Sequence, residues 1–223
     1  MRMSKGVLFI VSAASATGKD TIVSRVIKES DGEAVLSVSM TTRKPREKEK
    51  DGVNYFFVSE DEFRQNIAEG QMLEYAQYGR FFYGTPMKPV MKWLDEGKIV
   101  FLIIEVKGAA IVREKLPEAK SIFLLPPSMQ TLESRLRGRN SDTEESILRR
   151  MDIAKDEIAR AAEFDYIIMN DDLENAVSDF SSICRYEISR TNGLQADEND
   201  CAAADRLKKD NMINSISEVL KND

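Results

Sequence analysis

The stretch Val11–Thr21, VSAASATGKDT, combines a Gly-Lys pair with hydroxyl side chains and an aspartate. Residues of these types suit phosphate binding, because backbone N–H groups and a lysine can neutralise anionic oxygens at the start of a helix. The standard pattern is Gly, four residues, then Gly-Lys-Ser/Thr. Here Ala13 stands at the first glycine position, and Asp20 follows Lys19 where a hydroxyl is expected. The motif predicts a phosphate-binding loop with an atypical sequence.

The departures from the pattern have different chemical consequences. Alanine costs about 1 kcal/mol or more wherever the loop needs a left-handed backbone. Asp20 is a hard oxygen donor that can replace the hydroxyl as a Mg²⁺ ligand. The same carboxylate can instead repel phosphates, and a Gly-Lys pair that simply opens a helix is the plainest alternative.

A second basic motif, TTRKPR, places Arg43 and Arg46 on either side of Lys44-Pro45. Two arginines on a proline-stiffened backbone can bind a phosphate bidentately, although a solvated charge cluster has the same composition. The 223 residues include no histidine and two cysteines, Cys184 and Cys201. Serine and cysteine catalysis through histidine is therefore excluded, as is a Cys/His zinc site. The net charge of −6 argues against a general nucleic-acid binder.

Short apolar runs alternate with helical patterns along most of the chain, which predicts one α/β domain with a parallel sheet. The predicted strands are Val7–Val11, Ile99–Ile104, Ser121–Leu125 and Tyr166–Met169. The predicted helices are Thr21–Glu29, Pro89–Glu96, Ala109–Lys115, Met129–Arg137, Thr143–Ala162 and Leu173–Tyr186. The first strand, loop and helix supply the context that a phosphate loop requires.

Three segments fall outside this alternation. Residues 35–84 alternate in polarity, which indicates a small antiparallel insertion. The tail from about residue 191 is polar at first and then weakly amphipathic, so we expect a linker and one short helix of unknown role. The N-terminal apolar run is too short for an export signal or a membrane span, which favours a buried strand and a cytoplasmic protein.

Several blocks of the sequence, in this order, resemble guanylate kinases, the nucleoside monophosphate kinases that phosphorylate GMP from ATP. The blocks are SVSMTTRKPREKEKDGVNYFFVS, EFRQNIAEGQMLEYAQYGRFFYGTP, RLRGRNSDTEESILRRM and FDYIIMNDDL. The resemblance implies the P-loop nucleoside monophosphate kinase fold, a central parallel sheet flanked by helices with a mixed or antiparallel GMP-binding insertion and a helical lid. It implies a domain at 5–186, with core 5–34 and 86–186, insertion about 35–85 and lid about 126–157, followed by the linker and short helix at 187–223.

The resemblance also implies a GMP site in the insertion. Glu74 would accept hydrogen bonds from the N1–H and N2–H₂ groups of guanine, which adenine cannot offer. Glu105 stands where the family usually has an aspartate, Ile103 replaces another common acid, and Lys107 replaces a common glutamine. The residues implied are Arg43, Arg46, Tyr55 and Tyr83 for the phosphate, Ser39, Glu74 and Thr85 for guanine, and Glu105 near the nucleotide.

For ATP, the resemblance implies the phosphate loop and lid arginines that close over the substrates, stabilise the migrating group and exclude water. The ATP-binding residues implied are Ala13, Ala14, Ser15, Ala16, Thr17, Gly18, Lys19, Asp20, Thr21, Arg135, Arg139 and Asn170. The catalytic residues implied are Lys19, Arg43, Arg139 and Arg150, with Asp20 as a candidate Mg²⁺ ligand. The alternative interpretations are a helix with paired charges for the lid segment, and a turn and helix cap for Asn170-Asp171-Asp172.

The expected activity is ATP- and Mg²⁺-dependent phosphorylation of GMP and dGMP, with weaker ATP or Mg²⁺ affinity than a glycine-complete loop gives. One alternative is an interaction module that keeps the fold and has lost catalysis. Another is a kinase for a different phosphorylated substrate, because Gly-Lys-Asp-Thr also resembles the loop of kinases that act on ribosyl bisphosphates. Lys19 and the lid arginines favour the enzyme, and the Ser39–Glu74 pair favours GMP. No nucleic-acid or membrane partner is expected, and the sequence does not indicate an oligomeric state.

Overall fold

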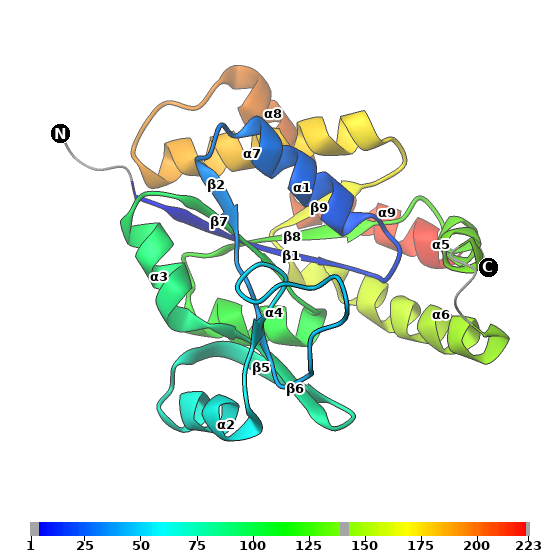
Figure 1. The fold of residues 1–223 in the computed structure, drawn as a ribbon. Coiled ribbons are helices and arrows are strands. Elements are labelled where there is room, and N and C mark those ends of the chain that lie inside the picture. Colours follow the sequence, from blue (N-terminus) through cyan, green and yellow to red (C-terminus); the bar gives the residue numbers. More distant parts are fainter. Residues whose placement is uncertain (1–4, 139–142, 222–223) are drawn as a thin grey trace.

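A central parallel sheet forms the middle layer of the molecule (Figure 1). The computed structural model describes residues 5–138 and 143–221. The five strands of this sheet are ordered β2-β7-β1-β8-β9. Their bounds are β1 Val7–Ala13, β2 Ala34–Leu36, β7 Ile99–Ile103, β8 Lys120–Leu125 and β9 Tyr166–Met169. The predicted α/β fold with a parallel sheet is confirmed.

The strands are continuous apolar runs because helices cover both faces of the sheet. β1 lies at the centre, where Val11 pairs with Ile103 of β7 and with Ile122 of β8. Its side chains alternate between two buried clusters: Ile10 packs on one face, and Phe9 packs on the other against Phe101. The parallel register brings the carboxyl ends of the strands to one edge of the sheet. The phosphate loop follows β1 at this edge, and Glu105 follows β7 there.

Helices on the two faces supply the rest of each cluster. α1 and α7 cover the face that carries Phe9, and α3, α4, α5 and α6 contribute to the face that carries Ile10 (Figure 1). Their bounds are α1 Lys19–Glu29, α3 Met87–Asp95, α4 Val106–Lys115, α5 Met129–Arg137, α6 Glu144–Ala159 and α7 Leu173–Thr191. The helix predicted over Thr143–Ala162 is divided, because α6 ends at Ala159 and a 3₁₀ turn, η1, spans Ala161–Glu163.

A second sheet, ordered β4-β3-β6-β5, forms a separate lobe below the central sheet (Figure 1). Its elements are β3 Met40–Thr41, β4 Phe56–Phe57, α2 Glu60–Ala68, β5 Met72–Tyr78 and β6 Phe81–Pro86. The sheet is mixed, since β3 is parallel to β4 and antiparallel to β6. Its small core contains Met40, Phe63, Met72 and Phe82. β2 belongs to the central sheet, so the second sheet begins with β3.

The tail differs from the single short helix that the sequence predicts. α7 continues to Thr191, and two helices follow, α8 Glu198–Arg206 and α9 Lys209–Lys221. α8 forms because the Asp197 side chain caps its first turn and Arg185 of α7 binds Asp200 through two hydrogen bonds of 2.6 and 2.8 Å. Between the helices, Leu207 is buried and its carbonyl accepts the Ile167 N–H at 2.9 Å. Within residues 5–138 and 143–221, none of the helices has the length and apolarity needed to cross a membrane.

Candidate active site

The segment between β1 and α1 is a tight loop that carries most of the residues predicted to bind ATP. Ala13 ends β1, residues 14–18 form the loop, and Lys19, Asp20 and Thr21 occupy the first turn of α1. Ala16 has φ 68° and Gly18 has φ 100°, so both lie in the left-handed region. The strain expected from alanine therefore falls on Ala16, whereas Ala13 is ordinary strand backbone.

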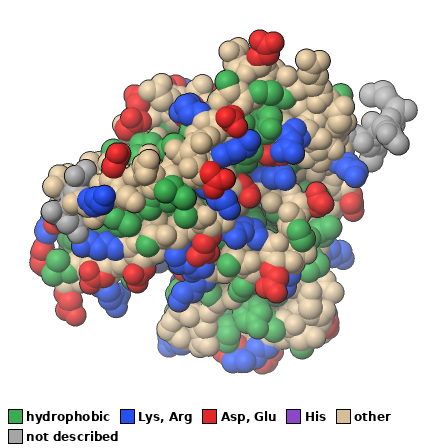
Figure 2. All heavy atoms as spheres, turned by 180° about the vertical axis from the view of Figure 1, so that it is seen from behind, with side chains coloured by type: hydrophobic (Ala, Val, Ile, Leu, Met, Phe, Trp, Pro, Cys, Tyr) green, Lys and Arg blue, Asp and Glu red, His purple; other side chains and the backbone are tan. Residues whose placement is uncertain are grey.

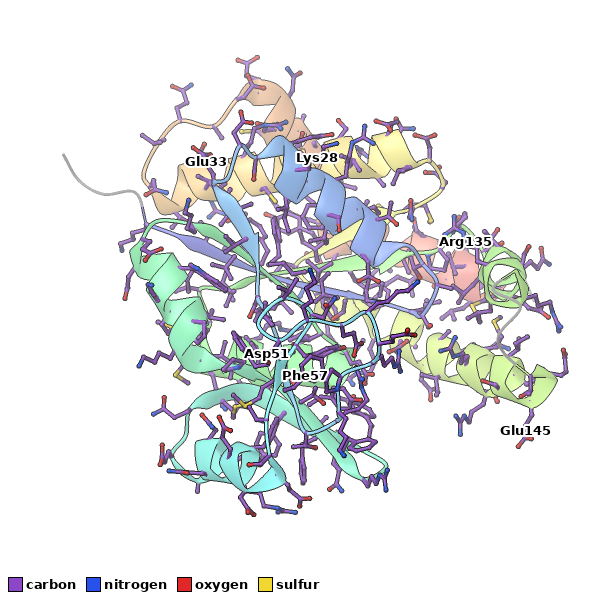
Figure 3. All side chains as sticks on the ribbon, viewed as in Figure 1. Lys28, Glu33, Asp51, Phe57, Arg135 and Glu145 are labelled. Carbon is purple, nitrogen blue, oxygen red and sulfur yellow. The ribbon has the colours of Figure 1, made fainter. Side chains whose placement is uncertain are left out.

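The carbonyl oxygen of Thr17 connects this loop to two distant elements. It accepts hydrogen bonds from Asn170 Nδ2 at 2.6 Å and from Arg135 Nη1 at 3.1 Å. Arg135 lies near the end of α5 (Figure 3), and Asn170 follows β9. A Cβ on Gly18 would come within 2.7 Å of Asn170 Nδ2, so this position requires glycine. The structure brings together the predicted ATP-side residues that it describes.

Lys19 and Asp20 lie side by side at the start of α1. Lys19 Nζ is 3.8 Å from Asp20 Oδ2, and the Asp20 side chain is 78% exposed. Contact at this distance with a largely exposed carboxylate is weak, so neither charge is sequestered by the other. Mg²⁺ is usually bound by one or two carboxylates together with substrate phosphates, and an exposed carboxylate beside a phosphate loop fits that donor set.

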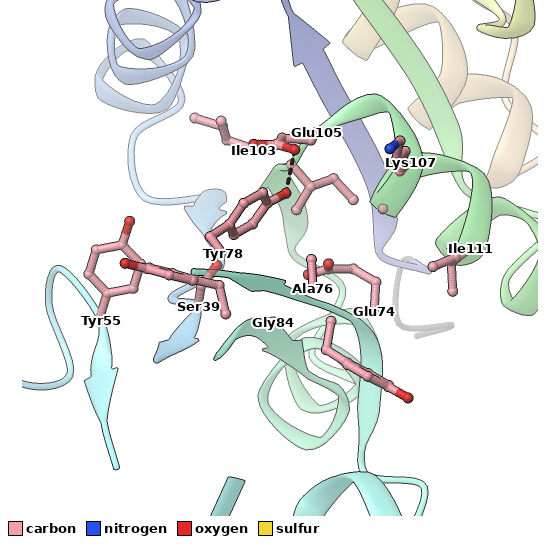
Figure 4. A pocket seen from close by; sticks show the side chains of 14 residues that line it. Ser39, Tyr55, Glu74, Ala76, Tyr78, Gly84, Ile103, Glu105, Lys107 and Ile111 are labelled. Carbon is pink, nitrogen blue, oxygen red and sulfur yellow. Dashed lines mark hydrogen bonds between the residues drawn. The ribbon is translucent and has the colours of Figure 1, made fainter. Parts of the chain in front are cut away.

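A cavity of about 320 Å³ lies between the second sheet and the edge of the central sheet (Figure 4). Its lining includes five residues predicted to bind GMP: Ser39, Tyr55, Glu74, Tyr83 and Glu105. Glu74 is 7% exposed, and its Oε1 accepts a hydrogen bond from Thr85 Oγ1 at 2.7 Å. Burial raises the pKa of Glu74, although the Thr85 hydrogen bonds oppose that shift. The cavity thus presents a nearly buried acceptor to a ligand that carries hydrogen-bond donors.

Tyr78 and Gly108 also belong to this cavity, and sequence reasoning missed both. The Tyr78 hydroxyl donates to Glu105 Oε2, which joins the end of β5 to the start of α4 (Figure 4). Burial, followed by the hydrogen bond to Glu105, raises the pKa of Tyr78. In the sequence Tyr78 is indistinguishable from any half-buried strand aromatic, so no local signal identifies it.

Arg43 and Arg46 do not line the cavity. Arg43 instead binds Glu49 bidentately, with both N–O distances at 2.9 Å, and the Arg46 N–H donates to the same carboxylate at 2.8 Å. The Arg43 guanidinium nevertheless lies 5.5 Å from the ring centre of Tyr55, which does line the cavity. Arg43 is therefore at the border of the cavity, and Glu49 is a partner that the sequence did not suggest.

A larger cavity of about 720 Å³ separates α6 from the second sheet and α4. It shares Tyr78, Glu105 and Lys107 with the first cavity, and the predicted catalytic residue Arg150 lines it from α6. Figure 2 shows the hollow between the arm that contains α6 and the lobe of the second sheet. Arg139, predicted as a catalytic and ATP-binding residue, lies outside the described residues.

Glu157 of α6 is a further acid of this larger cavity that the sequence did not suggest. Burial raises its pKa to about 7, the nearby Glu105 adds to the shift, and Lys19 opposes it. Because the charges of Glu105 and Lys19 both shift the pKa of Glu157, the phosphate loop, the start of α4 and α6 lie in one electrostatic environment. The two cavities and the phosphate loop together offer cationic side chains, including Lys19 and Arg150, to anionic ligands. The buried hydrogen-bond acceptor Glu74 lies at the end formed by the smaller cavity.

Comparison with known proteins decides the family. The sequence profile of the guanylate kinase family matches residues 5–187. The chain belongs to this family. A guanylate kinase of Neisseria gonorrhoeae is 48% identical over 196 residues, which cover 86% of this chain and 95% of that protein. One from Thermosynechococcus vestitus is 48% identical over 172 residues, covering 77% of this chain and 90% of that protein.

A solved structure supports the same conclusion for the fold. The crystal structure of guanylate kinase from Anaplasma phagocytophilum has a TM-score of 0.66 to this chain at 32% identity. The match covers 82% of this chain and 87% of that one. This guanylate kinase-family chain therefore has the nucleoside monophosphate kinase fold that the sequence blocks implied.

Proposed function

We propose that this chain transfers the terminal phosphoryl group of ATP to GMP, forming ADP and GDP, and that it accepts dGMP as well. Family membership supports the reaction, and the observation that carries the choice of base is Glu74. Glu74 is 7% exposed and accepts hydrogen bonds from the side chain and the backbone of Thr85, which leaves further acceptor capacity for a ligand in the cavity that it lines. Guanine supplies two adjacent donors to such a group, whereas adenine leaves it desolvated and unpaired.

The proposed roles follow from charge and position. Phosphoryl transfer depends mainly on in-line placement and on stabilising charge at the migrating group. Lys19 and the loop N–H groups would hold the ATP phosphates, while Arg43 with Tyr55 and Tyr83 would hold the GMP phosphate. Arg150, and Arg139 if the lid closes as expected, would neutralise the transferred group and exclude water. Arg135 and Asn170 act here on the loop itself, because both bind the Thr17 carbonyl.

Mg²⁺ is expected to accompany ATP, with Asp20 as the residue that would help to hold it. Bound there, the ion would neutralise negative charge on the phosphates. Asp20 is well suited to this role because its carboxylate is 78% exposed at the start of α1.

The alternatives from the sequence have less support. An interaction module has no need of a loop braced by Arg135 and Asn170 or of a lysine at the start of α1. A kinase for ribose phosphates has no need of a buried carboxylate that accepts from a base. GMP phosphorylation uses each of these features.

A coupled assay of ADP formation with ATP and Mg²⁺ tests the proposal, using GMP, dGMP, AMP and ribose 5-phosphate as acceptors. We expect rapid turnover with GMP and dGMP only. Glu74→Gln should lower kcat/KM for GMP by about 100-fold, because an amide N–H₂ cannot accept from guanine. Glu69→Gln, an exposed acid at the end of α2, is the matched control. Turnover of AMP equal to that of GMP, or a neutral Glu74→Gln, would contradict the proposal.

A further inference from the structure

The guanidinium of Arg43 is held in place by its own loop. Nη1 donates to Glu49 Oε2 and Nη2 to Glu49 Oε1, each at 2.9 Å, and Nη1 also donates to the Lys44 carbonyl at 2.8 Å. Glu49 Oε2 accepts the Arg46 N–H at 2.8 Å as well. The Arg43 and Glu49 side chains are 14% and 18% exposed, so the pair is largely covered. Parallel hydrogen bonds of this kind fix both the position and the plane of a guanidinium.

These contacts leave the Nε edge of the guanidinium without a carboxylate partner. Arginine has five N–H donors in a rigid planar group. The hydrogen bonds given above use two on Nη1 and one on Nη2, and the hydroxyl of Tyr83, which lines the GMP-side cavity, also interacts with the guanidinium. The Nε–H and the second Nη2–H lie next to each other on the adjacent edge and form another fork of the type that binds phosphate. Glu49 therefore occupies one fork of Arg43 and leaves a second one.

Aromatic rings place the Arg43 guanidinium at the border of the GMP-side cavity. The Arg43 guanidinium carbon is 5.5 Å from the ring centre of Tyr55 and 5.8 Å from that of Phe57. Phe57 is itself fixed, because its N–H donates to Asp51 Oδ1 at 2.8 Å. Phe57 and Asp51 both lie in the lobe of the second sheet (Figure 3). The Tyr55 and Tyr83 rings meet edge to face at 6.0 Å, and both line the cavity.

We propose that Glu49 is a positioning residue for GMP: it holds Arg43 by one fork so that the other fork faces the nucleotide phosphate. The inference deepens the proposed function and rests on it. Hydrogen bonds from Arg43, followed by that from the Arg46 backbone, lower the pKa of Glu49, so the carboxylate keeps its charge across the neutral range. Glu49 also binds the Arg46 backbone N–H through Oε2, so it fixes the Arg43 guanidinium relative to the backbone of the TTRKPR loop.

The opposite role for Glu49 is a plug, a carboxylate that occupies the phosphate position and must leave when GMP binds. Displacement would break three hydrogen bonds and leave a largely covered charge without partners, which is unfavourable. The positioning role keeps all three of these hydrogen bonds when GMP binds. The two roles predict opposite signs for the same substitution: removing a plug tightens GMP binding, and removing a positioning group weakens it.

The experiment compares Glu49→Ala and Glu49→Gln with Glu47→Ala and Glu47→Gln. Glu47 is an exposed acid in the same loop, so it controls for the change in net charge. Loss of a positioned charged hydrogen-bond network should raise the GMP KM and the GMP Kd about 10- to 100-fold in Glu49→Ala. Glu49→Gln keeps one acceptor and should lie between that variant and wild type. The ATP KM should change less than about twofold in all four, and the Glu47 variants should match wild type.

A double-substitution cycle separates positioning from general damage to the fold. If Glu49 acts through Arg43, adding Glu49→Ala to Arg43→Ala should weaken GMP binding no further. Calorimetric GMP titration alongside thermal unfolding keeps the test informative if a variant loses stability. GMP affinity in Glu49→Ala equal to or tighter than in Glu47→Ala, with wild type active, would overturn the inference alone. A wild-type chain that neither bound nor phosphorylated GMP would overturn the proposed function as well.

Discussion

Gly108, in the first turn of α4, lies so close to the Glu74 carboxylate that there is almost no space for a side chain at position 108. Glu74 is the residue that is proposed to bind guanine. A Cβ at this position would lie 3.0 Å from Glu74 Oε2 and 3.4 Å from Glu74 Cδ. These contacts are shorter than ordinary van der Waals separations, so the Glu74 side chain would have to shift by a few tenths of an ångström. The hydrogen-bonding geometry of Glu74 therefore depends on the absence of a side chain on a neighbouring helix.

Gly108→Ala is expected to raise the GMP KM roughly 10-fold, because small displacements of a positioning group are costly. The stability of the fold should not fall, since alanine favours a helix interior by about 1 kcal/mol over glycine. Steady-state kinetics with each substrate varied in turn, together with thermal unfolding, check both statements. The ATP KM is the internal control. A variant with unchanged GMP kinetics would show that Glu74 has more freedom than the packing suggests.

At the scale of residues, the sequence predicted groups that are chemically conspicuous and missed those that act through packing. Glu74 and Tyr55 were found because they lie in blocks that resemble guanylate kinases, and the cavity contains both. Glu49, Tyr78 and Gly108 were missed because their roles arise from contacts with Arg43, Glu105 and Glu74. One acid in a run of alternating charges gives no sign of which arginine it binds.

At the scale of elements, α6 carries an acid whose ionisation is coupled to the fold. Glu157 has a pKa raised to about 7, chiefly by burial, against about 4.3 for an ordinary glutamate. Between these values the folded chain binds more protons than the unfolded chain at this site. The free energy of unfolding therefore falls as pH rises through that window and levels off above it.

Glu157→Gln should remove this pH dependence, because the amide resembles the protonated acid. We expect the variant to match wild type near pH 4 and to exceed it at pH 8 by about 1–2 kcal/mol, after allowance for the partial exposure of the site. Denaturant unfolding at several pH values measures the difference. Glu145→Gln, at the exposed start of the same helix (Figure 3), should show no such trend. A difference that stayed constant with pH would contradict the assignment.

Element boundaries show where local sequence information ends. β9 matches its predicted bounds, and α5 does too, because Ser128 caps its first turn by accepting from the Thr131 N–H. The predicted helix over Thr143–Ala162 is divided at Arg160, where burial of Ala161 and Phe164 against the core redirects the chain. Periodicity identified the helices, but it could not predict a break imposed by packing.

At the scale of the whole molecule, the tail is part of the main core. α9 places Ile216 and Val219 in the same buried cluster as Ala154 and Ile158 of α6. The sequence showed a weak amphipathic pattern there but not its partner, because the packed face depends on where the chain returns. The family profile ends at residue 187, so this packing lies beyond it. α9 supports the helix that carries Arg150 toward the larger cavity.

Two isoleucines three residues apart on α9 test whether the tail contributes to folding as one unit with the domain. Ile216 is 7% exposed and Ile213 is 47% exposed. Ile216→Ala should lower the free energy of unfolding by about 2–5 kcal/mol, since it opens a cavity against α6, whereas Ile213→Ala should change it by about 0.5 kcal/mol or less. Denaturant unfolding followed by fluorescence of Trp93, which packs against the same cluster, reports on the core rather than on the tail. If the two variants unfolded alike, or if the Trp93 transition did not shift in Ile216→Ala, α9 would be a separate appendage and could not support α6.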